Sequence, residues 1–355
     1  MFDISLCWLI IFWGLNSTMK LLDNESIGID LGTSNVRIYV QGKGIVLNEP
    51  AVVAVNRNNG EMLALGDEAN NMLGRAPGNI AVIRPLRGGV ISNYHDTQRM
   101  LSAYLRKVIG RRLLARPSVM VCVPSGVTDV EKRALIEVTE EAGAKRASLI
   151  EEPIAAAIGA GIEISEPFGR MVVDIGGGTT DVAVISLGGL VTHQSIRVGG
   201  DSMDDAIAKY IKRKHDILIG ERTAEEIKVN IGTAFPKQEQ ATIEIAGRNV
   251  ITGLPRRMRM SSNDTIEALT EPLTEILEPI RTVLERTPPE LASDIAESGI
   301  CLTGGGSLLF GIDVLIGIKT GLKCYVAEDA ASCVAIGTGK AAEHMVPLTE
   351  ERLYE

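Results

Sequence analysis

The sequence predicts an α/β protein made of two similarly built domains, and three observations support this prediction. The chain has 355 residues, which is too long for one comfortable hydrophobic core. One pattern occurs twice: residues 27–40 and 171–185 each run from an apolar strand through Asp and a glycine-bearing turn into a second, alternating strand. Further stretches typical of strands and of helices follow each copy. The two matching β-hairpins indicate two domains that face each other.

Composition and charge indicate an ordinary folded protein that does not have nucleic acid as its partner. Apolar residues make up 45% of the chain and charged residues 23%, which is close to globular usage. The net charge of −9 argues against nucleic acid, because phosphate backbones are held by clustered Lys and Arg. The cysteines number 5 and show no C-x-x-C spacing, so reduced thiols in a cytosol are the simplest interpretation.

Residues 1–18 differ from the rest of the chain. Residues 4–15 are almost wholly apolar, and as a helix they would be about 18 Å long, too short for a hydrocarbon core of roughly 30 Å. Asp3 precedes this run and no basic residue comes before Lys20, which is unlike a secretory signal peptide. Two interpretations remain: a short anchor on the membrane surface, or a true start of translation at Met19. The second is favoured because Met19 leads directly into the first recognisable strand.

Strand and helix patterns continue through both halves of the chain. Residues 118–123 form an apolar run typical of a buried strand, and a Pro-Ser-Gly sequence ends it. The next helix is predicted to have Thr128 as its N-cap, with Glu131 completing a capping box. Residues 241–254 indicate a β segment of a smaller subdomain. Further helices are predicted at residues 96–109, 152–161, 204–215, 223–232 and 264–285.

The common glycine loops for nucleotides are absent. A Walker A loop would need Ser or Thr after Gly339-Lys340, and Ala341 stands there. Gly337 and Gly339 imitate a dinucleotide fingerprint, but too little chain follows them for a βαβ unit. A phosphate site therefore has to come from other parts of the sequence.

The two hairpins offer a phosphate site of another kind. Glycines after the acidic bend let backbone N–H groups approach phosphate oxygens without a Cβ in the way, and a neighbouring hydroxyl can add a donor. The acids at the bends, Asp30 and Asp174, are expected to hold Mg²⁺ largely through water, because this ion prefers oxygen ligands. Tight turns with Asx caps are the alternative, which two matching hairpins make less favourable. The residues expected to contact phosphate are Gly176, Gly177, Gly178 and Thr179 in one hairpin and Thr33, Ser34 and Asn35 in the other.

A third glycine cluster follows an apolar strand near the C-terminal end. Gly304, Gly305 and Gly306 precede Ser307 and a helix-like stretch. A backbone this open can pass beside a flat adenine and its ribose. An ordinary strand-to-helix turn is the alternative, although such a turn rarely needs three consecutive glycines.

Together these motifs resemble those of the superfamily that contains actin, the 70-kDa heat-shock chaperones and the sugar kinases. The hairpins are similar to its two phosphate motifs, residues 302–307 to its adenosine motif, and residues 151–159 and 335–339 to its two connecting helices. The resemblance covers nearly all of residues 25–345. The phrases that are specifically similar to the bacterial actin homologue MreB and its paralogues are residues 44–54, 75–79, 121–126, 196–205 and 221–228.

The resemblance implies an actin-like ATPase fold. Two lobes are expected, each built on a ribonuclease H-like mixed β-sheet with flanking helices, with the nucleotide in the cleft between them. Lobe I is expected to comprise residues 19–160 and 335–355, with a small subdomain at about 50–90. Lobe II is expected to comprise residues 161–334, with a small subdomain at about 205–260.

The resemblance also implies roles for individual residues. Glu152 occupies the position of the acid that orients the attacking water, with Thr179 beside it and Asp174 at the metal. A helix segment flanks the adenosine, and the third glycine cluster closes that pocket. The expected nucleotide contacts on this side are Glu225, Glu226, Ile227, Lys228, Gly304, Gly305, Gly306 and Ser307.

Two positions depart from the pattern of the family. Gly88-Gly89 stands where the family more often has an acid before glycine, and Asn230 replaces a common Glu near the nucleotide. Neither position belongs to the phosphate motifs. Both bear on filament contacts and nucleotide affinity.

A short segment resembles the membrane loop of the family. Leu113 and Leu114 are flanked by Arg111, Arg112 and Arg116, so an apolar tip can enter the membrane interface while cations meet anionic lipid. The alternative is a helix end that packs against its own core.

The function implied by the resemblance is that of a weak ATPase with ATP and Mg²⁺ as cofactors. Such a protein polymerises into paired protofilaments, lies in the cytoplasm at the inner face of the cell membrane, and works with membrane proteins of the cell-wall elongation machinery to set rod shape. A small-molecule kinase of the same fold is the strongest rival, but no insertion that could supply a base for a sugar hydroxyl is evident. A chaperone is less favoured, because nothing follows the ATPase region to bind peptide.

Overall fold

The computed structural model describes residues 26–110 and 116–343, and its centre is a pair of five-stranded mixed sheets. The first sheet has the order β10 (Arg146–Glu151), β9 (Ser118–Val123), β1 (Ile27–Leu31), β2 (Asn35–Val40), β3 (Gly44–Pro50). The second has the order β18 (Cys324–Val326), β17 (Ile300–Thr303), β11 (Arg170–Ile175), β12 (Thr180–Ser186), β13 (Gly189–Ile196). In chain order, each sheet begins with three antiparallel strands, and two later strands then pair in parallel beside the first of them. The shared topology confirms the repeat that the hairpins predict.

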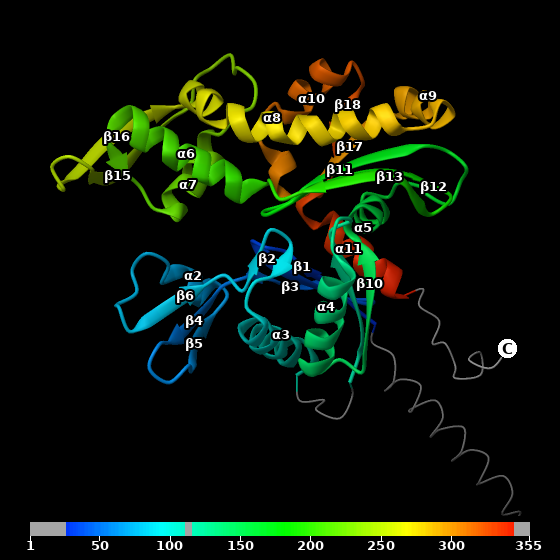
Figure 1. The fold of residues 1–355 in the computed structure, drawn as a ribbon, viewed down its shortest axis with the longest axis horizontal. Coiled ribbons are helices and arrows are strands. Elements are labelled where there is room, and N and C mark those ends of the chain that lie inside the picture. Colours follow the sequence, from blue (N-terminus) through cyan, green and yellow to red (C-terminus); the bar gives the residue numbers. More distant parts are fainter. Residues whose placement is uncertain (1–25, 111–115, 344–355) are drawn as a thin grey trace, which may run out of the picture.

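Helices lie beside each large sheet, in two halves that Figure 1 shows one above the other. The lower half contains the first sheet with α3 (Tyr94–Ile109) and α4 (Asp129–Glu141). The upper half contains the second sheet with α8 (Ser262–Arg286), α9 (Pro289–Ser298) and α10 (Ile312–Thr320). Each half has its own large hydrophobic core, so each sheet is stabilised separately.

A smaller sheet extends each half on the left of Figure 1. Below, it consists of β4 (Val53–Asn56), β5 (Met62–Leu65) and β6 (Ile80–Ile83), with α2 (Asp67–Asn71). Above, it consists of β14 (Ile217–Leu218), β15 (Thr242–Asn249) and β16 (Pro255–Ser261), with α6 (Gly200–His215) and α7 (Glu221–Ile231). A two-stranded hairpin, β7 (Leu86–Arg87) and β8 (Val90–Ile91), precedes α3. The β segment predicted at residues 241–254 is thus confirmed as part of a hairpin.

Two helices, α5 (Glu152–Gly159) and α11 (Cys333–Glu343), lie between the large sheets. Their backbones touch: a Cβ on Gly159 would lie 1.8 Å from a carbonyl oxygen of α11, and a Cβ on Gly337 would lie 1.7 Å from a carbonyl oxygen of α5. Residues of α5 pack with buried side chains from both large sheets. Only glycine at these two positions permits the approach, which brings the two halves together at one place.

The predicted helices agree with the structure to within a few residues. At the start of α4 the capping box is present, because Thr128 Oγ1 accepts from the Glu131 N–H at 3.3 Å and Glu131 Oε2 accepts from the Thr128 N–H at 2.8 Å. No helix in the described ranges is both long and apolar enough to cross a membrane. Residues 1–18, with the predicted anchor or upstream start, lie outside the described residues.

Candidate functional site

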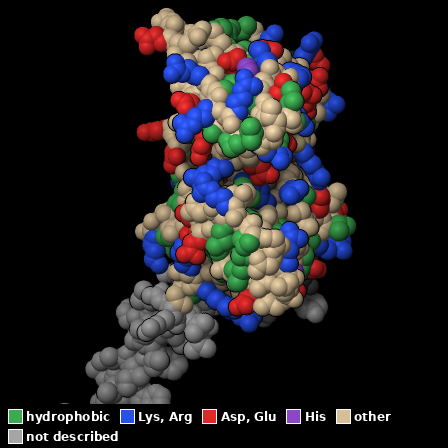
Figure 2. Space-filling model, turned by 90° about the vertical axis from the view of Figure 1, so that its left-hand side faces the viewer, with side chains coloured by type: hydrophobic (Ala, Val, Ile, Leu, Met, Phe, Trp, Pro, Cys, Tyr) green, Lys and Arg blue, Asp and Glu red, His purple; other side chains and the backbone are tan. Residues whose placement is uncertain are grey.

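The three glycine-bearing loops that the sequence singles out meet at one cavity between the two halves. The cavity has a volume of about 200 Å³, and the turns after β1, β11 and β17 line it. Figure 2 shows the molecule hollowed at its waist, between the halves, with acidic and basic side chains around the hollow. The predicted site residues that line the cavity are Asp30, Thr33, Ser34, Asn35, Glu152, Asp174, Gly176, Gly177, Gly178, Thr179, Glu225, Lys228, Gly304, Gly305 and Gly306.

Three further predicted residues do not line the cavity, although they belong to elements that do. Ile227 is fully buried in the upper hydrophobic core, and Glu226 forms an exposed ion pair with Arg222 at 3.1 Å. Ser307 is buried and donates to the Gly304 carbonyl at 2.7 Å. The helical period explains the first two, because residues 225 and 228 share the face of α7 that meets the cavity while residues 226 and 227 point elsewhere.

The two phosphate-type turns are in direct contact with each other. A Cβ on Gly177 would lie 2.0 Å from Ser34 Oγ, and a Cβ on Gly178 would lie 2.5 Å from Thr33 Oγ1. The Gly89 N–H donates to Thr33 Oγ1 at 3.1 Å, so a third turn joins them. These glycines are therefore needed for the two halves to approach, in addition to leaving room for a ligand.

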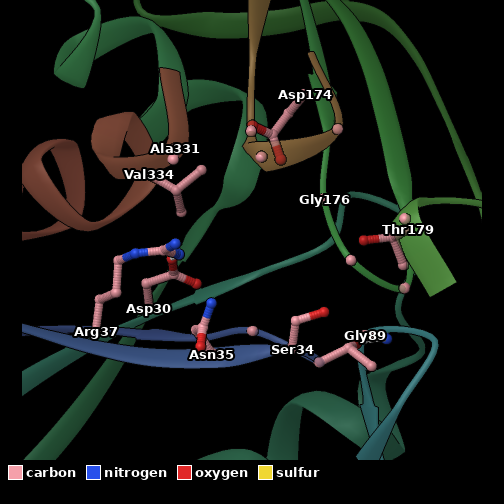
Figure 3. A pocket seen from close by; sticks show the side chains of 18 of the residues that line it. Asp30, Ser34, Asn35, Arg37, Gly89, Asp174, Gly176, Thr179, Ala331 and Val334 are labelled. Atoms are coloured by element: carbon pink, nitrogen blue, oxygen red, sulfur yellow. Dashed lines mark hydrogen bonds and ion pairs between the residues drawn. The ribbon is translucent and has the colours of Figure 1, made fainter. Parts of the chain in front are cut away.

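The acids at the two bends face the cavity from opposite halves, as Figure 3 shows. Asp174 accepts a hydrogen bond from Thr303 Oγ1 at 2.7 Å, and burial, with a contribution from Asp181, raises the pKa of Asp174 to about 7. Burial also raises the pKa of Asp30, while Arg37 acts in the opposite direction. Carboxylate oxygens are the donors that a hard divalent cation prefers, so this pair fits Mg²⁺ held together with phosphate and water.

Glu152 reaches the cavity because it is the first residue of α5 and follows β10 directly. Its side chain is buried, and burial raises the pKa of Glu152 well above its usual range; the charges of Asp181, Asp174 and Asp30 raise it further. A carboxyl group with a raised pKa at a cavity wall can position a water molecule or accept its proton.

A contact between Ser125 and Asp181 joins the halves and was not predicted from the sequence. Asp181 on β12 is wholly buried, and one of its oxygens accepts from both the N–H and the Oγ of Ser125 at 2.8 Å each. Its other oxygen, Oδ2, has no hydrogen-bond partner among the described residues. Ser125 comes from the Pro-Ser-Gly sequence after β9, so this turn does more than end a strand.

The third glycine cluster also lines the cavity. Gly304 has a positive φ of 80°, and a Cβ on it would lie 2.3 Å from the Ile175 carbonyl oxygen, whereas a Cβ on Gly305 would meet nothing within 4 Å. Gly305 therefore leaves open space at this wall. Lys228 lines the cavity as well, and its Nζ donates to the Gly200 carbonyl at 2.9 Å and to Asp204 Oδ2 at 2.7 Å.

The two departures from the family pattern have local explanations. Gly88 and Gly89 both have positive φ values, 53° and 74°, which favour glycine over an acid. Asn230 is exposed at the end of α7 and donates to the Glu226 carbonyl at 2.7 Å, and it does not line the cavity. Leu113 and Leu114 of the predicted membrane loop lie outside the described residues.

Known proteins of one family match this chain over most of its length. The family profile described as MreB/Mbl protein matches residues 24–350. The cell shape-determining protein Mbl of Bacillus cereus is 50% identical over 329 residues, which cover 93% of this chain and 99% of that protein. The cell shape-determining protein MreB of Escherichia coli (strain K12) is 52% identical over 325 residues, which cover 90% of this chain and 94% of that protein. The crystal structure of MreB5 of Spiroplasma citri bound to ADP matches with a TM-score of 0.86 at 38% identity, covering 90% of this chain and 99% of that one. With its fold, its cavity and these matches in agreement, the chain belongs to the MreB/Mbl family.

Proposed function

We propose that this chain is an ATP-binding, ATP-hydrolysing bacterial actin-like protein that polymerises into membrane-associated filaments and organises cell-wall synthesis to set rod shape. The observation that carries this proposal is the convergence of three glycine-bearing turns and two buried acids on one cavity between two similar halves. Relatives with about 50% sequence identity to this chain are named as cell shape-determining proteins, and a structural neighbour was crystallised bound to ADP. Both facts support the same proposal.

In this proposal each group has a separate task. The amides of Gly176 to Gly178 and the turn at Thr33 to Asn35 hold phosphate oxygens, with the Thr179 hydroxyl as a further donor. Asp30 and Asp174 hold Mg²⁺ largely through water, and the ion, when bound, neutralises phosphate charge. Glu152 aligns the attacking water, because phosphoryl transfer needs positioning and charge neutralisation more than covalent help.

The division into lobes is also part of the proposal. Residues 19–160 with 335–355 form lobe I and residues 161–334 form lobe II, with α5 and α11 as the hinge. The backbone contact between these two helices supports this, since glycine at positions 159 and 337 lets the helices that join the halves pack directly on each other. Contacts such as that of Ser125 with Asp181 then hold the closed cleft.

Assembly and location follow from family membership. We propose head-to-tail association of identical chains into paired protofilaments in the cytoplasm, at the inner face of the membrane, with membrane proteins of the cell-wall elongation machinery as partners. Leu113 and Leu114 are the proposed attachment, because burying two leucine side chains is worth roughly 3–6 kcal/mol at most. A small-molecule kinase has no observation in its favour.

Sedimentation separates these proposals. The wild-type chain is expected to pellet as filaments with Mg²⁺ and ATP, and to bind liposomes that contain anionic lipid. Leu113→Ser with Leu114→Ser is expected to reduce liposome binding while nucleotide binding persists. Absence of filaments, together with sugar-dependent release of ADP, would instead favour the kinase. Unchanged liposome binding by the double variant would contradict the proposed membrane loop.

A further inference from the structure

One cation faces the phosphate side of the cavity, and neither the motifs nor the proposed mechanism uses it. Arg37 lies on β2, directly opposite Asp30 in the β1–β2 register. Its Nη1 atom is 3.3 Å from Asp30 Oδ2, and its side chain is 15% exposed. Figure 3 shows the guanidinium group beside the Asp30 carboxylate, below Val334. Arg37 is thus held in place at the cavity wall by the acid that is proposed to serve Mg²⁺.

The two hairpins differ at this position. Asp30 pairs with Arg37, but at the same place in the second hairpin Asp174 pairs with Asp181. One bend therefore has an acid opposite a cation, and the other has an acid opposite an acid. The repeat in the fold thus does not extend to the charges of the site.

Asp30 is also engaged on both of its oxygens. Oδ2 is paired with Arg37, and Oδ1 is 3.6 Å from Cys122 Sγ, which donates to it. Part of the negative charge of Asp30 is therefore offset before any cation binds. Asp174, by contrast, accepts from the neutral Thr303 hydroxyl.

Charge in the cavity favours a role for Arg37 toward an anion. Lys228, the other cation of the lining, is occupied by Asp204 and by the Gly200 carbonyl. A guanidinium group has five N–H donors, and Arg37 Nε has no hydrogen-bond partner within the described ranges. The charged side chains that line the cavity are Asp30, Glu152, Asp174, Glu225, Arg37 and Lys228. Acids thus outnumber bases around a site proposed for a polyanion.

We propose that Arg37 is a phosphate-recognition residue that offsets phosphate charge from the β1–β2 hairpin, so that this chain retains nucleotide binding when Mg²⁺ is removed. The inference rests on the proposed nucleotide-binding function. Its physical basis is the planar, positively charged guanidinium, which presents several donors to phosphate oxygens at once. When Mg²⁺ is present, the ion supplies much of the same charge, and the contribution of Arg37 becomes smaller.

The test is equilibrium binding of a fluorescent ADP analogue, in excess Mg²⁺ and in EDTA. Arg37→Gln is expected to weaken binding in EDTA by about tenfold or more, the scale of losing a charged hydrogen bond, and by about threefold or less in Mg²⁺. Arg37→Lys, which keeps the charge, is expected to retain most of the binding in EDTA. Arg281→Gln is the matched control, because Arg281 is 83% exposed on α8 and does not line the cavity.

The outcomes separate this role from a structural one. If Arg37 only neutralises Asp30, Arg37→Gln will lower the melting temperature and change affinity by the same factor with and without Mg²⁺, which overturns the inference. Failure of the wild-type chain to bind the analogue in Mg²⁺ overturns the proposed function as well. If the glutamine variant does not fold, Arg37→Met, whose apolar side chain suits the buried position, carries the same comparison.

Discussion

Glu152→Gln separates nucleotide binding from hydrolysis, because this change keeps the shape of the side chain and removes its charge. Burial, and then the charges of three other acids, raises the pKa of Glu152, so a neutral amide at this position avoids both the cost of a buried charge and repulsion around the cavity. Affinity for Mg²⁺-bound ATP is therefore expected to be unchanged or slightly tighter. Turnover is expected to slow by about 10²-fold, which corresponds to about 2.7 kcal/mol on the barrier.

The assay pairs two measurements on the same protein. Phosphate release under single-turnover conditions reports hydrolysis, and a fluorescent ATP analogue reports binding. Glu151→Gln is the matched control, since Glu151 is the preceding residue at the end of β10 and does not line the cavity. Phosphate release at the wild-type rate by Glu152→Gln, with filaments still forming, would refute the assignment and leave Glu152 as an ordinary residue at a helix start.

Three other changes test the contact between α5 and α11, the contact between two loops, and the helix cap at Glu131. Gly337→Ala is expected to lower the free energy of unfolding, measured by thermal melting, by about 3 kcal/mol, because its Cβ would lie 1.7 Å from an α5 carbonyl. Gly78→Ala, which has open space around its Cβ, is the control in the same measurement. Gly177→Ala is expected to weaken ATP binding, measured by calorimetry, by about tenfold or more, because its Cβ would lie 2.0 Å from Ser34 Oγ. Adding Ser34→Gly to this variant should restore part of the lost affinity. If it restores none, the contact between the two loops is not the cause of the loss. Hydrogen bonds from Thr128, with Arg197 nearby, hold the pKa of Glu131 below its usual value. The stability that the Glu131 carboxylate adds to the folded protein is therefore complete above about pH 4.5 and is lost as the pH falls through the lowered pKa. Glu131→Ala should cost about 1 kcal/mol in denaturant titrations at pH 7 and progressively less in more acidic buffer, and a cost independent of pH would contradict this.

Local patterns in the sequence were sufficient for much of the fold. The hairpins, the capping box at Thr128 and the helix bounds depend on residues close together in the chain, so turn and cap chemistry predicts them. The reason for the glycine at position 337 is not local. It lies in the packing of α11 on α5, and these helices are far apart in sequence and meet only in the folded chain.

The site was predicted less completely than the fold. The acids and glycines of the turns could be identified because the same pattern occurs twice. Arg37 could also have been placed, since pairing in a tight hairpin sets it opposite Asp30. The contact of Ser125 with Asp181 joins different halves, so no sequence spacing indicates it. Glu226 and Ile227 entered the prediction because a whole helix segment was assigned, although the helical period turns both away from the cavity.

The most direct test of the account is a crystal structure of the chain with Mg²⁺ and a non-hydrolysable ATP analogue. The account predicts that the phosphates lie between the turn at residues 33–35 and the turn at residues 176–178, with the adenine beside residues 304–306. Nucleotide density at any other place, or phosphates that contact neither turn, would contradict the claim that the cavity between the two halves is the ATP site.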